Sequence, residues 1–308
     1  MYVLNFIRGF CMALADSVPG VSGGTIAFIL SFYDDFVNSL NNLISGNKSD
    51  RLSALKFLSK IGIGWVVGFI LSVLFITSIF EKNIYQISSL FLGFIIASIP
   101  LIIKSERKTL KGNYKNIIFL IIGVIVVCAI TYFNPMTGSN HSFSIKFENL
   151  SIGLGFYIFI SGMVAISAMV LPGISGSTIL LIFGLYTPIL NGIKEIFKLN
   201  LEYLPGILIF CIGIIVGIFA TVRGVRSLLR KYRSQTIYCI IGLMLGSIYT
   251  VIMGPKSLEI PQATMSISTF SVIFFAIGCT LVPALEKLKN VLKNKDTNYE
   301  KQVEVEYN

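Results

Sequence analysis

Hydroxyl and glycine residues gather in a ten-residue sequence that occurs twice in this chain. Residues 18–27 read VPGVSGGTIA, and residues 171–180 read LPGISGSTIL. Glycines let a ligand approach the backbone, serine and threonine add hydrogen-bonding hydroxyls, and free backbone N–H groups attract anions. The two copies therefore predict an uncharged cradle for an anion such as phosphate, formed by Ser22, Gly23, Gly24, Thr25, Ser175, Gly176, Ser177 and Thr178.

Each copy also contains a Pro-Gly pair that interrupts an apolar stretch, at Pro19-Gly20 and Pro172-Gly173. Proline breaks a helix, so we expect each pair to end one half-helix and the residues after it to begin another. The first turn of the second half-helix exposes free N–H groups and about half a positive charge. Hydrocarbon tolerates such breaks only where protein or a wet cavity covers them, and paired breaks point to a binding site.

A purely structural role is the alternative for these residues. Serine and threonine cap helices, and glycine allows close helix packing in membrane bundles. A single PGxSG sequence fits this interpretation well, whereas its duplication favours a binding site. Both interpretations stay open at this point.

Two charged residues lie close to the first break. Asp16 precedes Pro19 by three residues, and its counterpart in the second copy is Met169. The turn therefore does not require a carboxylate, and an ionisable group in the membrane costs on the order of 3 kcal/mol. We hypothesise that Asp16 couples transport to H⁺ or Na⁺, with a cap or packing hydrogen bond as the alternative. Arg8 could receive an anionic headgroup at the mouth of this hairpin, or serve only as a positively charged cytoplasmic residue.

The composition is that of an integral membrane protein. Of the 308 residues, 54% are hydrophobic and 13% are charged, against about 25% charged in soluble domains; the mean hydropathy is +0.80. A crossing takes about 20 apolar residues. Six charge-free runs approach or reach that length, at 61–80, 84–103, 116–133, 205–222, 236–253 and 267–285.

The remaining reactive residues give no sign of catalysis or metal binding. The five cysteines include no CxxC pair and are expected to pack as small apolar residues, and the single His141 lies in a loop without a ligand cluster. We therefore predict no catalytic residue, no metal and no cofactor. The net charge of +10 is interpreted as a topology signal rather than as a nucleic-acid-binding surface.

The repeat extends beyond the ten residues. It aligns four glycine pairs at offsets of 153, 149, 149 and 155 residues, namely Gly9 with Gly162, Gly64 with Gly213, Gly93 with Gly242 and Gly123 with Gly278. The unit is a broken hairpin followed by three spans. We predict a first repeat at 1–133 with its hairpin at 4–40, an external loop at 134–150, a second repeat at 151–285 with its hairpin at 151–193, and a cytoplasmic tail at 286–308.

The charge distribution predicts that the second repeat is inverted. A hairpin returns to the side from which it started, so three further crossings turn the second unit over. Twenty of the 25 lysines and arginines then share one side: the N-terminus, the loops at 41–60, 104–116 and 223–235, and the tail. This predicts cytoplasmic termini and an all-α membrane fold with inverted repeats. Hairpins that cross the membrane fully satisfy the same count and stay an alternative; we favour re-entrant hairpins, because residues 4–18 form only about 22 Å of helix, somewhat short of the core.

The sequences ADSVPGVSGGT (residues 15–25) followed by Tyr33, and LPGISGS (residues 171–177) followed by GLY (residues 184–186), resemble the bacterial polyprenyl-phosphate transporter (PopT) family, formerly a domain of unknown function. The similarity covers nearly the whole chain. It departs at Ser31, which faces Gly184 in the repeat and where we expect glycine. The resemblance implies that the protein flips undecaprenyl phosphate across the bacterial cytoplasmic membrane for reuse in cell-wall synthesis.

Three other functions remain open on the sequence alone. Opposed half-helices could carry a small inorganic anion in a secondary transporter or channel, and an intramembrane lipid phosphatase or protease is a further alternative. A structural scaffold would leave the paired breaks unexplained. Besides the lipid substrate, the expected partners are membrane lipids, H⁺ or Na⁺, and a second copy of the chain in a homo-oligomer.

Overall fold

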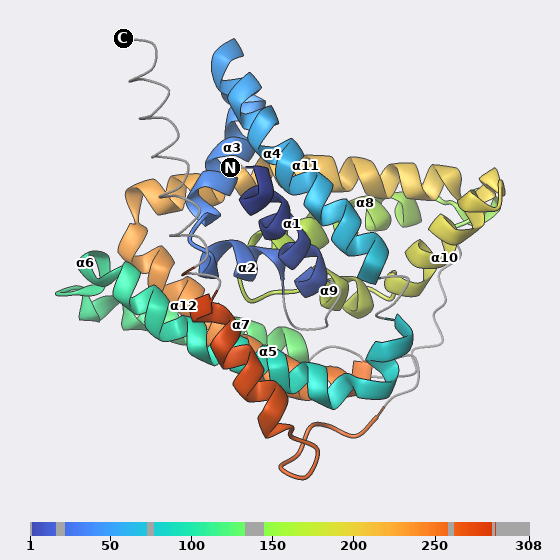
Figure 1. The fold of residues 1–308 in the computed structure, drawn as a ribbon. Helices are drawn as coiled ribbons and strands as arrows, with labels where there is room; N and C mark the ends of the chain where they lie inside the picture. The colour runs from blue at the N-terminus through green and yellow to red at the C-terminus, as the bar shows by residue number, and fades with distance from the viewer. Residues whose placement is uncertain are drawn as a thin grey trace, which may run out of the picture.

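The computed structural model describes residues 2–16, 22–72, 77–132, 145–257, 262–284 and 287, which form helices and connecting segments with no strand among them (Figure 1). The predicted breaks at Pro19 and Gly20, the loop residue His141 and nearly all of the 286–308 tail lie outside these residues. The main helices are α1 (Tyr2–Asp16), α2 (Gly23–Ile29), α3 (Tyr33–Ser45), α4 (Lys48–Leu71), α5 (Thr77–Ser105), α6 (Arg107–Leu110), α7 (Ile117–Tyr132), α8 (Ile152–Val170), α9 (Gly176–Ile182), α10 (Tyr186–Phe197), α11 (Leu204–Lys231) and α12 (Arg233–Met253), followed by a helix at Val272–Ala284.

Six helical segments of the described chain are long and apolar enough to cross a membrane: Lys48–Leu71, Asn83–Ser105, Tyr114–Tyr132, Ile152–Val170, Leu201–Lys231 and Arg233–Lys256. Five of them overlap the runs predicted from the sequence. The sixth, Ile152–Val170, is the first arm of the second predicted hairpin. The predicted run at 267–285 contains the shorter apolar helix Val272–Ala284. The chain is therefore a multi-pass, all-helical membrane protein.

Two of the basic connections that we expected to be loops are largely helical. Only residues 46–47 separate α3 from α4, and only Tyr232 separates α11 from α12. The charge-free runs locate the apolar core of each helix, but a helix continues into the polar region because its backbone bonds do not depend on apolar side chains. The predicted 41–60 and 223–235 loops thus correspond mainly to polar helix ends.

Glycines bring the helices into close contact, and they do so at matching positions in the two halves. A Cβ atom on Gly64 of α4 would come within 2.0 Å of the Phe6 carbonyl oxygen of α1, and one on Gly213 of α11 within 2.2 Å of the Phe159 carbonyl oxygen of α8. These two contacts are related by the offsets of 153 and 149 that align the sequence. Small residues allow this close approach in membrane helix pairs.

The other spans pack across the two halves. Gly93 of α5 lies against the Phe275 carbonyl of the last helix, and Gly242 of α12 lies against the Leu120 carbonyl of α7. Each contact is the repeat counterpart of the other. Figure 1 shows α5, α7 and α12 running together, and α4 alongside α1. The core is thus shared by both halves.

A second correspondence appears in the turns that follow the short helices α2 and α9. Ser31 and Gly184 both adopt a left-handed backbone, with φ of 54° and 65°. Glycine adopts this conformation freely, while for other residues it costs about 1–2 kcal/mol. The shared conformation explains why glycine was expected at both positions and shows that the fold tolerates Ser31.

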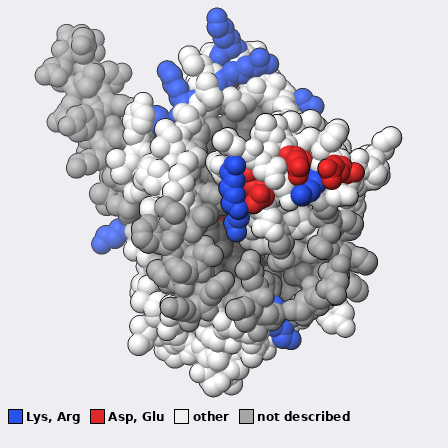
Figure 2. All heavy atoms as spheres, turned by 90° about the vertical axis from the view of Figure 1, so that its right-hand side faces the viewer, with Lys and Arg blue, Asp and Glu red and all other residues white. Residues whose placement is uncertain are grey.

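The three basic connections lie at one end of the molecule. Arg223 donates to the Ser45 hydroxyl at the end of α3 (3.4 Å), and Arg233 pairs with Glu106 at the end of α5 (2.6 Å). Figure 2, which faces the right-hand side of Figure 1, shows basic side chains along the upper edge, a mixed group of basic and acidic side chains below them, and mostly uncharged surface over the rest of the described residues. Exposed apolar side chains cover the flanks of the spans, among them Ile63 of α4 and Ile125 of α7, each about 60% exposed. This pattern suits a protein surrounded by lipid.

Candidate functional site

The first break is held together by capping hydrogen bonds. Ser22 has an extended backbone and caps α2 by accepting a hydrogen bond from the Thr25 N–H at 3.2 Å. Asp16, the last residue of α1, accepts from the Gly23 N–H at 2.6 Å. The carboxylate thus closes the gap between the two half-helices and satisfies a first-turn donor of α2, as an acidic group at a helix N-terminus does.

The second carboxylate oxygen of Asp16 bonds to α4. Trp65 Nε1 donates to Asp16 Oδ2 at 2.9 Å, so the acidic group is held by one donor from the hairpin and one from a spanning helix. Trp65 is the single tryptophan of the chain. In the second repeat, Met169 and Ile214 occupy the positions that correspond to Asp16 and Trp65. The pair is therefore present in the first half only.

The second break has a different arrangement. Gly173 has φ of +90° and lies so close to α12 that a Cβ atom would come within 2.5 Å of the Leu243 backbone. Ser175 precedes α9 without a side-chain cap bond. Its hydroxyl instead lies 2.7 Å from that of Ser177. The hydroxyls of the second break are thus paired with each other.

The two breaks contact each other directly. The Gly173 N–H donates to Thr25 Oγ1 at 2.8 Å, and the Ser22 hydroxyl donates to the Leu171 carbonyl at 3.2 Å. Gly24 makes this approach possible, because a Cβ atom there would lie 2.7 Å from the Val170 carbonyl oxygen. Polar groups from sequence positions nearly 150 residues apart therefore form one cluster. We call it the tip contact, comprising Ser22, Gly24, Thr25, Leu171 and Gly173.

Of the eight residues predicted as a cradle, Ser22, Gly24 and Thr25 belong to the tip contact, whereas the Ser175 hydroxyl bonds to that of Ser177 within its own break. Ser22, Thr25, Ser175 and Thr178 are all buried, with at most 4% exposure. Ser22 and Thr25 are engaged with the opposite hairpin rather than open to a ligand. These bonds join the two breaks, and phosphate binding there stays a prediction.

Arg8 lies apart from the tip contact. It is 8% exposed, donates to Asn5 Oδ1 at 2.8 Å and stacks over the Phe32 ring at 4.6 Å. Its Nε is buried without a hydrogen-bond partner. The guanidinium is thus sequestered in α1 and α3 packing, and the proposed reception of a headgroup would require it to move.

Two residues next to the tip contact were not predicted to have a role in the site, although Tyr33 belongs to the motif that carries the resemblance. Trp65 supports Asp16, and the Tyr33 hydroxyl donates to the Val170 carbonyl at 3.1 Å. Signals existed for both. Tyr33 matches Tyr186 in the repeat, whereas neither Trp65 nor Asp16 has an identical residue at the corresponding position of the second half. Paired presence and paired absence across a repeat are therefore useful indicators of a shared role.

Comparison with known proteins identifies the family. A family model described as VCA0040-like, undecaprenyl phosphate translocase-like, matches residues 12–269, which include both breaks. The chain belongs to this family. Its members include the polyprenyl-phosphate transporter of Vibrio cholerae, 33% identical over 265 residues (80% of this chain and 76% of the relative). The polyprenyl-phosphate transporter of Staphylococcus aureus is 34% identical over 283 residues (90% and 95%).

The family assignment confirms the resemblance found in the paired motifs. The VCA0040-like family is a family of transporters, which removes the intramembrane enzyme from the alternatives. No solved structure matches the chain.

Proposed function

We propose that the protein translocates undecaprenyl phosphate across the bacterial cytoplasmic membrane and binds the phosphate at the tip contact. The observation that carries this proposal is the hydrogen bond from the Gly173 N–H to Thr25 Oγ1, at 2.8 Å. It joins a backbone donor of one half to a hydroxyl of the other. Once this bond opens, a phosphate oxygen can accept a hydrogen bond from the Gly173 N–H and from the Thr25 hydroxyl, because both groups donate to phosphate.

Opening of the tip contact is the step that admits the headgroup. Ser22 and Thr25 are buried and bonded across the contact, so the phosphate gains these donors only when the hairpins separate. The headgroup is the one part of the lipid that hydrocarbon excludes, since an ion in the membrane is costly. The polyprenyl chain stays in the surrounding lipid while the phosphate passes between the hairpins.

We further propose that the two halves are inverted repeats built around re-entrant hairpins. The paired glycine contacts Gly64–Phe6 and Gly213–Phe159 support the repeat. The clustering of three basic connections at one end supports an orientation with cytoplasmic termini. The first helices of the two hairpins differ in length. The 15 residues of α1 span about 22 Å, and the 19 residues of α8 span about 28 Å.

Asp16 is proposed to couple this movement to H⁺ or Na⁺. It touches the first residue of α2 and a spanning helix at the same time. A change in its charge or in its bound cation would therefore reach both the tip contact and α4. The absence of the Asp16–Trp65 pair from the second half supports a role beyond the shared fold.

Reconstituted protein tests the transport function. Labelled undecaprenyl phosphate is placed in one leaflet of proteoliposomes, and its appearance in the other leaflet is followed together with the flux of phosphate, sulfate and chloride. We expect protein-dependent movement of the lipid without flux of the soluble anions. Soluble-anion flux without lipid movement would instead support the small-anion transporter.

A further inference from the structure

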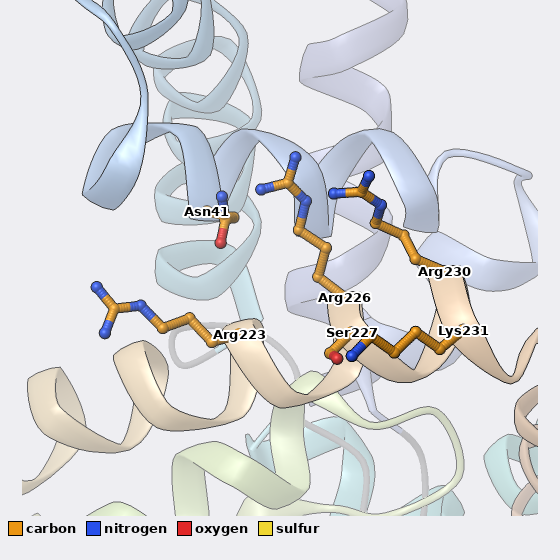
Figure 3. A pocket seen from close by; sticks show the side chains of 6 residues that line it. All are labelled: Asn41, Arg223, Arg226, Ser227, Arg230 and Lys231. Carbon is orange, nitrogen blue, oxygen red and sulfur yellow. The ribbon is translucent and has the colours of Figure 1, made fainter.

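A group of basic side chains near the end of α11 lines a cavity against α3. The cavity has a volume of about 450 Å³, within the range of about 300–1,000 Å³ typical of ligand pockets. Figure 3 shows Arg226 and Arg230 extending from α11 toward the helix that carries Asn41. We call it the α3–α11 cavity, and its lining residues are Asn41, Arg223, Arg226, Ser227, Arg230 and Lys231.

The positive charge of this cavity is not balanced by protein groups. Among the described residues, no acidic side chain lines it. Arg233 lies just beyond it and is neutralised by Asp34 at 2.9 Å and Glu106 at 2.6 Å. Arg226, by contrast, keeps its Nε buried without a hydrogen-bond partner. Burying an unpaired donor is unfavourable, so the arrangement suits an anionic ligand that the protein itself does not supply.

The arginines of α11 have no counterparts in the first half, where α4 ends at Leu71, before the aligned positions. At the offset of 149 residues, the first half has Leu74, Thr77 and Glu81 where the second half has Arg223, Arg226 and Arg230. A preference for basic residues on the cytoplasmic side explains their sign. This preference does not explain why four basic residues line one cavity. A lysine or arginine favours the cytoplasmic side from any position in a connection, so it need not lie beside other basic residues.

The cavity lies just beyond the apolar run of α11, and two helices connect it to the neighbourhood of the tip contact. The charge-free run of α11 ends at Val222, directly before Arg223. Thr221 donates to the Ser167 hydroxyl of α8 at 2.6 Å, four residues before the break at Leu171. Along α3, Asn41 lies eight residues, or about 12 Å of helix, from Tyr33, which bonds to the Val170 carbonyl beside the tip contact.

We propose that the α3–α11 cavity is a second binding site, selective for a phosphate group that carries at most one ester bond. The ligand is the headgroup of polyprenyl phosphate at the membrane surface or inorganic phosphate from solution. A phosphomonoester carries about −1.5 to −2 charges at pH 7, and arginine forks bind such oxygens through paired N–H donors. If the ligand is the lipid, the site rests on the proposed function, because it then holds the headgroup before or after the headgroup reaches the tip contact.

Arginine modification tests occupancy of this site. Full-length protein in nanodiscs is treated with phenylglyoxal, and modification of Arg226 and Arg230 is followed by mass spectrometry with Arg107 of α6 as the internal control. Polyprenyl phosphate, inorganic phosphate and phosphatidylglycerol are added separately. We expect polyprenyl phosphate to slow modification of Arg226 at least fivefold and to leave Arg107 unchanged. Equal protection of Arg226 by inorganic phosphate would identify soluble phosphate, rather than the lipid headgroup, as a ligand of the cavity.

Three results would overturn the site: no protection of Arg226, equal protection of Arg107, or equal protection by phosphatidylglycerol, whose phosphodiester carries a single charge. Because wild-type protein is used, a folding defect does not obscure them. Lipid movement without protection leaves the proposed function intact and removes this site. Protection without lipid movement keeps the site and removes the transport function.

Variants provide a second measurement on the same protein. Arg226→Gln is expected to weaken binding of polyprenyl phosphate about tenfold, with partial recovery in Arg226→Lys, since lysine keeps the charge but loses the fork. The matched control Arg107→Gln removes the same charge at the same end and is expected to change binding less than twofold. Equal losses in Arg226→Gln and Arg107→Gln would show that only the overall charge matters, against a specific cavity.

Discussion

Asp16 has hydrogen-bond donors on both carboxylate oxygens, from Gly23 of α2 and Trp65 of α4. This environment suits a carboxylate that only accepts hydrogen bonds. The observed geometry serves two purposes together: it caps the first turn of α2, and it ties the hairpin to a spanning helix. The capping role that we set against ion coupling is therefore present in the structure, and coupling is a question of whether its charge changes during transport.

Replacing Asp16→Asn tests that question. The asparagine amide keeps one acceptor oxygen but presents an N–H₂ group to one of the two donors. We therefore expect the free energy of unfolding to fall by about 1.5–3 kcal/mol, the usual contribution of a hydrogen bond to a charged group. Undecaprenyl phosphate movement in proteoliposomes should fall about tenfold or more and lose its dependence on pH or Na⁺. Trp65→Phe keeps the charge and should keep that dependence. Unchanged ion dependence in Asp16→Asn would remove the coupling role.

Gly24 sets how closely the two breaks approach. In Gly24→Ala, the added methyl group would meet the Val170 carbonyl oxygen at 2.7 Å and the Met169 carbonyl oxygen at 2.9 Å. Overpacking of this kind costs about 1–3 kcal/mol. We expect a lower thermal unfolding temperature and a loss of lipid movement. Gly62→Ala on α4 is the control, because no atom lies within 4 Å of the position that its methyl group would take. Equal effects of both variants would contradict a specific close approach.

At the scale of elements, the sequence predicts the broken helices well and their ends poorly. Ser22 caps α2, and Ser175 precedes α9, as the motif spacing indicates. The ends of α3, α4, α11 and α12 were missed because charged residues continue a helix beyond the apolar run that marks its membrane part. The cross-contacts between the breaks could not be read from spacing at all, since they depend on how the two hairpins are oriented.

The close packing of α8 against α11 gives a prediction at this scale. Gly213→Ala would place a methyl group 2.2 Å from the Phe159 carbonyl oxygen, whereas Gly224 on the same helix has no atom within 4 Å of that position. We expect Gly213→Ala to lower the unfolding free energy by about 1–3 kcal/mol and Gly224→Ala to leave it nearly unchanged. Thermal unfolding of purified protein measures both. A neutral Gly213→Ala would contradict direct backbone contact between these helices.

For the whole molecule, the repeat predicts a consistent arrangement of the two halves. Offsets found in the sequence relate contacts in the structure, as in Gly93 with Phe275 and Gly242 with Leu120. The two halves differ in several respects, among them the Asp16–Trp65 pair of the first half and the arginines of α11 in the second. A shared scaffold with different polar groups in each half suits a transporter in which the two halves have different roles.

The orientation of the molecule is tested by labelling from the two sides. After replacement of the five native cysteines, Lys111→Cys at the end of α6 and Lys194→Cys on α10 are introduced singly. We expect a membrane-impermeant maleimide to reach the α10 position in intact cells and the α6 position only after the membrane is opened. Labelling of both positions from outside, or the reverse pattern, would contradict cytoplasmic termini.

Separation of the hairpins is the central claim, and a reversible cross-link tests it most directly. Tyr33 bonds the Val170 carbonyl at 3.1 Å beside the tip contact, and neither residue belongs to the proposed phosphate site. In a cysteine-free background, Tyr33→Cys and Val170→Cys are joined by a short bis-methanethiosulfonate reagent that replaces the length of the tyrosine ring. We expect the linked protein to stop moving undecaprenyl phosphate between leaflets and to recover after dithiothreitol. Movement at the unlinked rate with cross-linking complete would contradict the account.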